Sequence, residues 1–144
     1  MRRISILTCG LLALLLTGCA SSQAPELPEY QGAGGMTQWD IQPEAYLYHY
    51  KHGFTGVDSL GYNPKLQKVW SRLGAAITCR INYDKAHMIQ LLIQQFGKKA
   101  ITHELNGIGF HHVQSRKVPQ FCNSWRVNEI NAALQRYQQG RFNS

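Results

Sequence analysis

The first 18 residues of this 144-residue chain determine how much of it is left to form a folded domain. Two arginines follow the initial methionine, and residues 4–16 then contain no charged side chain. An apolar run of roughly 7 to 15 residues behind a basic start is typical of a secretory signal peptide and is too short to span a bilayer. We therefore predict that residues 1–18 are an export signal and take no part in the folded domain.

The residues that end this signal, Leu16-Thr17-Gly18-Cys19, resemble the lipobox of bacterial lipoproteins. In that family the peptide is cut before the cysteine, whose sulfur takes a diacylglycerol, and the new amino group usually receives a further acyl chain such as palmitate. The resemblance covers residues 1–22 and implies that Cys19 is the lipidation site. Two or three acyl chains give a lasting anchor, because each buried methylene contributes about 0.8 kcal/mol and one chain binds only reversibly. The alternative is a plain secretory signal with a chance cysteine.

The residues after Cys19 indicate which membrane holds the anchor and where the folded domain begins. Ala20, rather than an aspartate, follows the cysteine, which resembles the pattern of enteric lipoproteins that are released to the outer membrane. We therefore expect an outer-membrane anchor that faces the periplasm. Residues 19–36 contain prolines and glycines without an aliphatic cluster, so they are predicted to be a flexible, lipidated tether. Residues 37–144 suffice for a single domain with one core.

Two of the four cysteines remain for a disulfide in the mature protein. Cys9 leaves with the signal peptide and Cys19 carries lipid, so Cys79 and Cys122 are the pair left in a compartment where disulfides persist. We predict that they are bonded to each other. Two free thiols or half of a metal site remain the alternative, although neither cysteine has the CxxC spacing of a zinc site.

The charge of the chain is positive and unevenly placed. The formal charge is +7, and removal of Arg2 and Arg3 leaves 13 basic against 8 acidic residues, a charge of +5. The late basic residues predict a positive face on the C-terminal half; they are Lys98, Lys99, Arg116, Lys117, Arg126, Arg136 and Arg141. In the periplasm such a face would meet lipid headgroups, acidic wall components or partner proteins, and not nucleic acid. Solvated side chains without a partner fit the same pattern.

Helix caps and apolar spacing predict three helices. Each has a polar residue at its start, apolar residues three and four positions apart, and a glycine at its end. The predicted helices, with their caps and terminating glycines, are 64–73 (Asn63, Gly74), 85–96 (Asp84, Gly97) and 125–139 (Ser124, Gly140). The type of residues 39–50 stays open, because their alternating tyrosines suit a strand while Asp40 and Pro43 suit the start of a helix.

Strands are predicted between these helices. Residues 75–81 alternate as a strand would, and Asn106-Gly107 between residues 100–105 and 108–114 is a strong signal for a two-residue hairpin turn. The predicted fold is therefore a small α+β domain, in which about three helices pack on a short antiparallel sheet. The disulfide would join the first strand to the entry of the last helix.

No catalytic or metal-binding residue follows from the motifs. The segment that begins His103-Glu104 echoes the zinc-protease pattern HExxHxxGxxH, but Gly107 stands where the second histidine is needed. A looser metal site from His103, His111 and His112 is weakened because neighbouring residues of a strand point to opposite faces. The acids Asp40, Glu44, Asp58, Asp84, Glu104 and Glu129 show no spacing that selects a glycosidase pair. We therefore predict no metal and no cofactor.

The function predicted by class and compartment is that of an accessory protein. Many small lipoproteins with one disulfide serve envelope machines as pilotins, stabilisers or activators, and this analogy favours a non-enzymatic assembly or binding component. It predicts a partner surface formed by exposed aromatic residues or by the basic C-terminal half. One alternative is a small envelope hydrolase that uses a histidine with Glu104 or Asp58. Another is an inhibitor or ligand binder that presents an exposed loop at residues 53–61.

Overall fold

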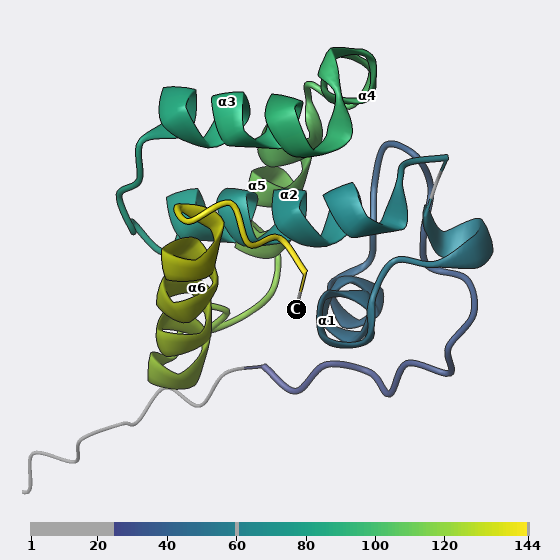
Figure 1. The fold of residues 1–144 in the computed structure, drawn as a ribbon. Coiled ribbons are helices and arrows are strands. Elements are labelled where there is room, and N and C mark those ends of the chain that lie inside the picture. Colours follow the sequence, from purple (N-terminus) through teal and green to yellow (C-terminus); the bar gives the residue numbers. More distant parts are fainter. Residues whose placement is uncertain (1–24, 60, 144) are drawn as a thin grey trace, which may run out of the picture.

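The computed structural model describes residues 25–59 and 61–143 (Figure 1). They form helices α1 (Pro43–His52), α2 (Pro64–Thr78), α3 (Lys85–Phe96), α4 (Lys98–His103), α5 (Gly107–Arg116) and α6 (Ser124–Tyr137), with a short 3-10 turn, η1 (Gly56–Ser59). Within these ranges the only β pairing is one isolated bridge between Met36 and Ile41. The predicted α+β fold is therefore wrong, because the described chain is helical and has no sheet. The predicted signal peptide and Cys19 lie outside the described residues.

Helix α2 forms the centre of the molecule (Figure 1). It begins as predicted at Asn63-Pro64, where the Asn63 side chain accepts hydrogen bonds from the backbone N–H groups of Lys65 and Leu66. Residues 66–76 include ten buried residues of this helix, and α5 and α6 both pack against it. Burial on several faces explains why polar side chains of α2, such as Gln67 and Ser71, also lie in the interior.

The predicted end of this helix at Gly74 and the predicted strand at residues 75–81 are wrong. Helix α2 runs through Gly74 to Thr78. A Cβ atom on Gly74 would lie 2.6 Å from the backbone nitrogen of His112 and 2.7 Å from the carbonyl oxygen of Ile108. The glycine therefore allows two helices to approach closely, and the chain turns only afterwards, at Arg80 with a φ of 57°.

The predicted hairpin around Asn106-Gly107 is also wrong. Asn106 has φ −82° and ψ 0°, whereas the hairpin turn typical of Asn-Gly needs positive φ. Residues 98–103 form α4, and Gly107 starts α5. A Cβ atom on Gly107 would lie 2.5 Å from Cδ1 of Trp70. Glycine is thus required here because α5 packs directly on a tryptophan of α2, which the local sequence does not reveal.

Helices α3 and α6 confirm two predictions. The Asp84 side chain accepts a hydrogen bond from the backbone of His87 at the start of α3, and Gly97 ends it with a φ of 86°. Helix α6 begins one residue earlier than predicted, because its cap is Asn123 and not Ser124. Capping chemistry depends on side chains within one turn, and it located the start of α3 correctly and that of α6 to within one residue.

Residues 39–50, whose type was left open, contain the start of α1. Pro43 is its first residue and Gln42 its N-cap, without a side-chain hydrogen bond, so Asp40 is not the cap. Its Tyr46 and Tyr50 are buried in the core beside Phe121, with ring centroids 6.2 Å and 5.4 Å from that ring. Tyrosines four residues apart thus share the inner face of a helix.

The described part of the predicted tether, residues 25–36, contains no helix but contacts the domain. Leu27, Tyr30 and Met36 are half-buried against the core. The Tyr30 ring lies 5.1 Å from that of Tyr48, and its hydroxyl is 3.2 Å from Nε2 of His49. Side chains on both sides of the predicted boundary at residue 36 therefore pack together.

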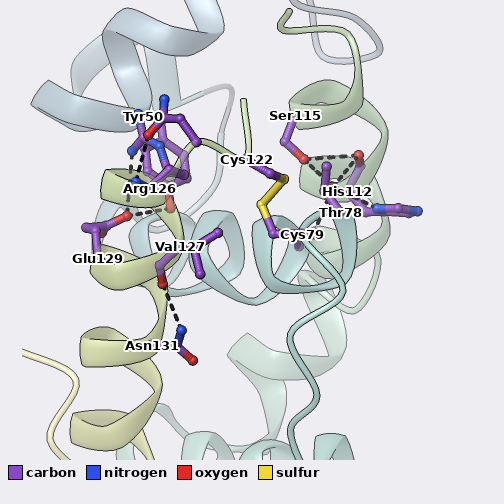
Figure 2. Close-up of a disulfide and its surroundings, with 12 residues drawn as sticks. Tyr50, Thr78, Cys79, His112, Ser115, Cys122, Arg126, Val127, Glu129 and Asn131 are labelled. Atoms are coloured by element: carbon purple, nitrogen blue, oxygen red, sulfur yellow. Dashed lines mark hydrogen bonds and ion pairs between the residues drawn. A yellow bond between two sulfur atoms is a disulfide. The ribbon is translucent and has the colours of Figure 1, made fainter. Parts of the chain in front are cut away.

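The predicted disulfide between Cys79 and Cys122 is confirmed (Figure 2). It joins the end of α2 to the residues before α6, rather than a strand to a helix. The two cysteines are 43 residues apart. Closing a loop of that size restricts the unfolded chain by about 4 kcal/mol in the entropic model, a large share of the stability of a small domain.

Candidate functional site

An exposed tryptophan stands on a loop whose backbone is fixed. Trp39 is 80 % exposed. The Thr37 hydroxyl accepts hydrogen bonds from the backbone N–H groups of Trp39, at 3.3 Å, and Asp40, at 3.0 Å. The backbone N–H of Thr37 donates to the carbonyl of Asp40 at 2.7 Å, which closes the turn. These hydrogen bonds therefore fix the backbone that carries the exposed Trp39 ring.

This loop is tied to helix α5. The buried amide of Gln114 accepts a hydrogen bond from Ile41 N at 3.1 Å through Oε1, and its Nε2 donates to the carbonyl of Trp39 at 3.4 Å. The Ile41 side chain is fully buried beside it. An ion pair between Asp40 and Lys117 adds a second link to the residue that follows α5. Together these contacts set the position of Trp39 relative to α5.

Between this loop and α5 lies an open, largely apolar groove of about 460 Å³. We call it the Trp39 groove, and its lining residues are Gln38, Trp39, Tyr62, Asn106, Gly109, Phe110, Val113 and Gln114. Its volume falls within the range of about 300 to 1,000 Å³ that is usual for ligand sites. None of the lining residues carries a charge, so the groove suits an uncharged, apolar occupant.

Gly109 opens the floor of this groove. It is exposed, and a Cβ atom built on it would meet nothing within 4 Å. The other two glycines inside helices, Gly74 and Gly107, are in contact with a neighbouring element. Glycine in a helix costs about 1 kcal/mol relative to alanine, so Gly109 weakens α5 without making room for any described part of the chain.

None of these lining residues was predicted from the sequence to bind a partner. Residues 108–114 were predicted to form a strand, in which Gly109 and Val113 share a face but Phe110 points away from them. On a helix, positions 106, 109, 110 and 113 form one strip. The i, i+3, i+4, i+7 spacing was the signal that could have found the groove.

The three histidines considered as metal ligands do not meet. His111 is fully buried, with Nε2 2.9 Å from Oε1 of Gln67 and Nδ1 3.2 Å from the Tyr46 hydroxyl. His112 bonds the Thr78 hydroxyl at 2.9 Å (Figure 2), whereas His103 is exposed on α4. In residues 25–59 and 61–143 no three histidine, cysteine or acidic side chains are grouped so that they could hold a metal ion.

Burial determines the charge state of His111. Removal of the ring from water, with a smaller effect from the nearby Arg72 cation, lowers the pKa of His111 to about 3. The ring is therefore neutral at physiological pH, and its partners fix one tautomer: Nε2 donates to Gln67 and Nδ1 accepts from Tyr46. Both ring nitrogens are used inside the fold, so this histidine holds helices α1, α2 and α5 together.

Glu104, one of the acids considered for a hydrolase, is also bound inside the fold. Its carboxylate accepts a hydrogen bond from Nε1 of Trp70 at 3.0 Å and one from the backbone N–H of Asn63 at 2.7 Å. The side chain is buried at the start of α2, where the helix dipole favours a negative charge. These contacts connect the end of α4 to α2 and leave the carboxylate shielded from a substrate.

The predicted pairing of a histidine with Asp58 has a counterpart in His49. Nε2 of His49 lies 3.6 Å from Oδ2 of Asp58, and Nδ1 lies 3.3 Å from the Gly53 carbonyl. The His49 ring is almost completely buried and has Tyr30 and Tyr48 packed against it. The pair therefore lies under aromatic side chains and links α1 to η1, rather than lining an open cleft.

A charged cluster lies beside the disulfide (Figure 2). Glu129 accepts from Nε of Arg72 at 2.9 Å and from the Tyr50 hydroxyl at 3.0 Å, and Nη1 of Arg126 lies 3.6 Å away. Both guanidinium groups lie over the Tyr50 ring, at 4.0 Å and 4.2 Å from its centroid. Arg126, counted above in the positive face, is thus buried, whereas Lys98, Lys99, Arg116, Lys117 and Arg141 are exposed.

Comparisons with known proteins add no identity to this geometry. No family model matches the chain, and neither the curated proteins nor the solved structures provided a match. None of the helices in the described residues is long and apolar enough to span a membrane. The function therefore has to be inferred from the residues themselves.

Proposed function

We propose that this chain is a bacterial envelope lipoprotein, anchored through Cys19 in the outer membrane, which acts as a non-enzymatic accessory protein and binds a partner protein in the Trp39 groove. The exposure of Trp39 carries the proposal. Burying a large apolar side chain contributes roughly 1.5 to 3 kcal/mol, and the 80 % exposure of Trp39 leaves most of that contribution for a partner. Tryptophan is also among the residues most enriched at the energetic centres of interfaces.

The surroundings of the groove favour a protein as the partner. Val113 in the groove and Leu105 just before it are large apolar residues that are more than half exposed. Exposed apolar surface rimmed by polar groups such as Gln38 and Asn106 is typical of protein interaction sites. The fixed backbone of the Trp39 loop lowers the entropic cost of binding, because the loop is already ordered.

The disulfide supports the proposed compartment. Disulfides persist in oxidising compartments such as the periplasm and are rare in the cytosol. The bond between Cys79 and Cys122 fits the export signal and the lipobox that precede the domain. Three features from different parts of the chain thus favour the same location.

A second candidate function, inhibition of a periplasmic enzyme, is favoured by Val57. This residue is 92 % exposed in η1, on the loop that the sequence singled out as a binding loop. An inhibitor would insert Val57 into the cleft of its target. This candidate predicts that Val57→Asp abolishes the interaction. Substitutions in the Trp39 groove should leave it intact.

The test is affinity purification of the full, lipidated chain from detergent-solubilised envelopes. We expect a stoichiometric partner with the wild type, and at least about tenfold less of it with Trp39→Ala, as for loss of an interface centre. Trp125→Ala is the matched control, because Trp125 is a tryptophan with 60 % exposure outside the groove. Equal recovery with Trp39→Ala, or no stoichiometric partner with the wild type, would contradict the proposal.

A further inference from the structure

We infer that the partner element in the Trp39 groove is an amphipathic α-helix, with an uncharged apolar face and acidic flanks, that crosses helix α5 at Gly109. The inference rests on the proposed function and names the partner's chemistry. It follows from the open glycine, from the helical geometry of the groove floor, and from the charges in and around the groove.

The described chain already packs helices on glycine. At Gly74, α2 meets the backbone of α5 so closely that a Cβ atom would lie 2.6 Å from a backbone nitrogen of that helix. At Gly107, α5 meets the Trp70 ring of α2 equally closely. Gly109 also lacks a side chain, but it lies on the side of α5 that faces away from α2. No described atom lies within 4 Å of a Cβ atom built on it. A second helix laid across this point would come as close to α5 as α2 does.

The groove floor has the form that a helix fits. Asn106, Gly109, Phe110 and Val113 follow the i, i+3, i+4, i+7 rows of α5, which interdigitate with the side-chain rows of a crossing helix. Trp39 forms the opposite wall. Addition of a partner strand would need a strand edge, and the β pairing in the described residues is limited to the single bridge between Met36 and Ile41. The geometry therefore favours a helix over an added β-strand.

The charges specify the two parts of that helix. A charged side chain buried in the uncharged groove would lose water without gaining a counterion, which is strongly unfavourable. The inserted face is therefore apolar. Beyond Val113 the exposed Arg116 continues from α5, whereas the charge of Lys117 is paired with that of Asp40, and the chain after the signal peptide has a formal charge of +5. Acidic residues flanking the inserted face would complement this positive surface.

The experiment is site-specific photo-crosslinking in living cells with the full lipidated chain. A p-benzoylphenylalanine residue replaces Gln38 or Val113, which line the two sides of the groove. The same residue in place of the exposed Gln90 on α3 serves as the control position. Crosslinked peptides are then sequenced by mass spectrometry. We expect crosslinks from both groove positions to residues three, four or seven apart in one acid-flanked partner segment, and none of these from the control.

A variant within the groove links the crosslinks to Gly109. Gly109→Gln places a good helix former in open space, so α5 stays folded while the side chain occupies the crossing point. The crosslink yield should fall at least about tenfold, with a thermal midpoint no lower than that of the wild type. An unchanged crosslink yield in the folded variant would overturn the crossing at Gly109.

The outcomes separate this inference from the proposed function. Crosslinks to consecutive or alternate partner residues, or to a segment with basic flanks, overturn the acid-flanked helix but leave a protein partner in the groove. Crosslinks to a second copy of the chain or to its own residues 19–24 overturn the helix of a separate partner. No polypeptide crosslinked from either groove position overturns both proposals.

Discussion

Individual polar residues in this protein hold the fold together from the inside. His111, Glu104 and Glu129 attracted interest as possible ligands or catalysts, yet each has its polar atoms bonded to neighbours within the domain. Buried polar groups that are fully satisfied fix one arrangement of the helices around them. Exposure therefore separates these structural residues from the candidate binding residue better than chemical type does, because the Trp39 side chain is 80 % exposed.

At this scale His111 makes stability depend on pH. Its pKa is about 3 in the folded protein and near 6.5 in the unfolded chain. Between those values the unfolded chain binds a proton that the folded protein does not, so the free energy of unfolding falls as the pH is lowered from 6.5 toward 3. The expected loss from this group is about 2 kcal/mol between pH 6.5 and 4.5.

Urea unfolding of His111→Gln at the same two pH values measures this contribution. The variant is less stable than the wild type at neutral pH, because glutamine cannot replace both ring contacts, but its stability should fall less on acidification. His87→Gln, which changes an exposed histidine of α3, is the control and should retain the wild-type slope. If His111→Gln and the wild type lose equal stability on acidification, the assignment of His111 as a buried, neutral histidine is wrong.

At the scale of elements, glycine limited what the sequence could reveal. Caps and apolar spacing correctly located α2, α3 and α6, since these signals lie within one helical turn. Gly97 ended a helix as predicted, whereas Gly74 and Gly107 lie where helices touch. A glycine that ends a helix and a glycine that lets another helix approach look the same in a sequence. The partner that distinguishes them is distant in the chain, so residues 75–81, 100–105 and 108–114 were wrongly predicted as strands and the groove was missed.

Two glycines of α5 should respond to alanine in opposite directions. In Gly107→Ala the new Cβ would lie 2.5 Å from Cδ1 of Trp70, so the helices must shift, at a cost of roughly 1 to 3 kcal/mol. In Gly109→Ala the new Cβ lies in open space, and the gain in helix propensity raises stability by about 1 kcal/mol. Urea or thermal unfolding of both variants measures the difference. Equal effects would contradict the assignment of one glycine to packing and the other to the groove.

At the scale of the molecule, the described residues form six helices with one disulfide, and the proposed lipid anchor would hold them beside a membrane. The disulfide could be predicted from the sequence, because two cysteines are left for pairing in the predicted mature chain and the predicted compartment is one in which disulfides persist. The sequence did not predict the helical architecture, which depends on contacts such as that of α2 with α5. The predicted anchor at Cys19 concerns residues outside the described ranges.

The anchor is tested by labelling cells with radioactive palmitate. We expect the wild-type chain to be labelled and to fractionate with the outer membrane, because several acyl chains bind a bilayer lastingly. Cys19→Ser should remain unlabelled and leave the outer-membrane fraction, while Cys9→Ser, which changes the cysteine inside the predicted signal, should behave as the wild type. If the wild type is not labelled and fractionates in the same way as Cys19→Ser, the predicted lipid anchor is contradicted.

The most direct test of the Trp39 groove as a binding site is to measure stability and partner recovery together in Gly109→Ala. The account predicts opposite changes: the thermal midpoint rises, because alanine strengthens α5, and the amount of partner recovered with the lipidated chain from envelopes falls, because a methyl group stands where the partner approaches. A variant that is more stable and still recovers the partner at the wild-type level would contradict the account.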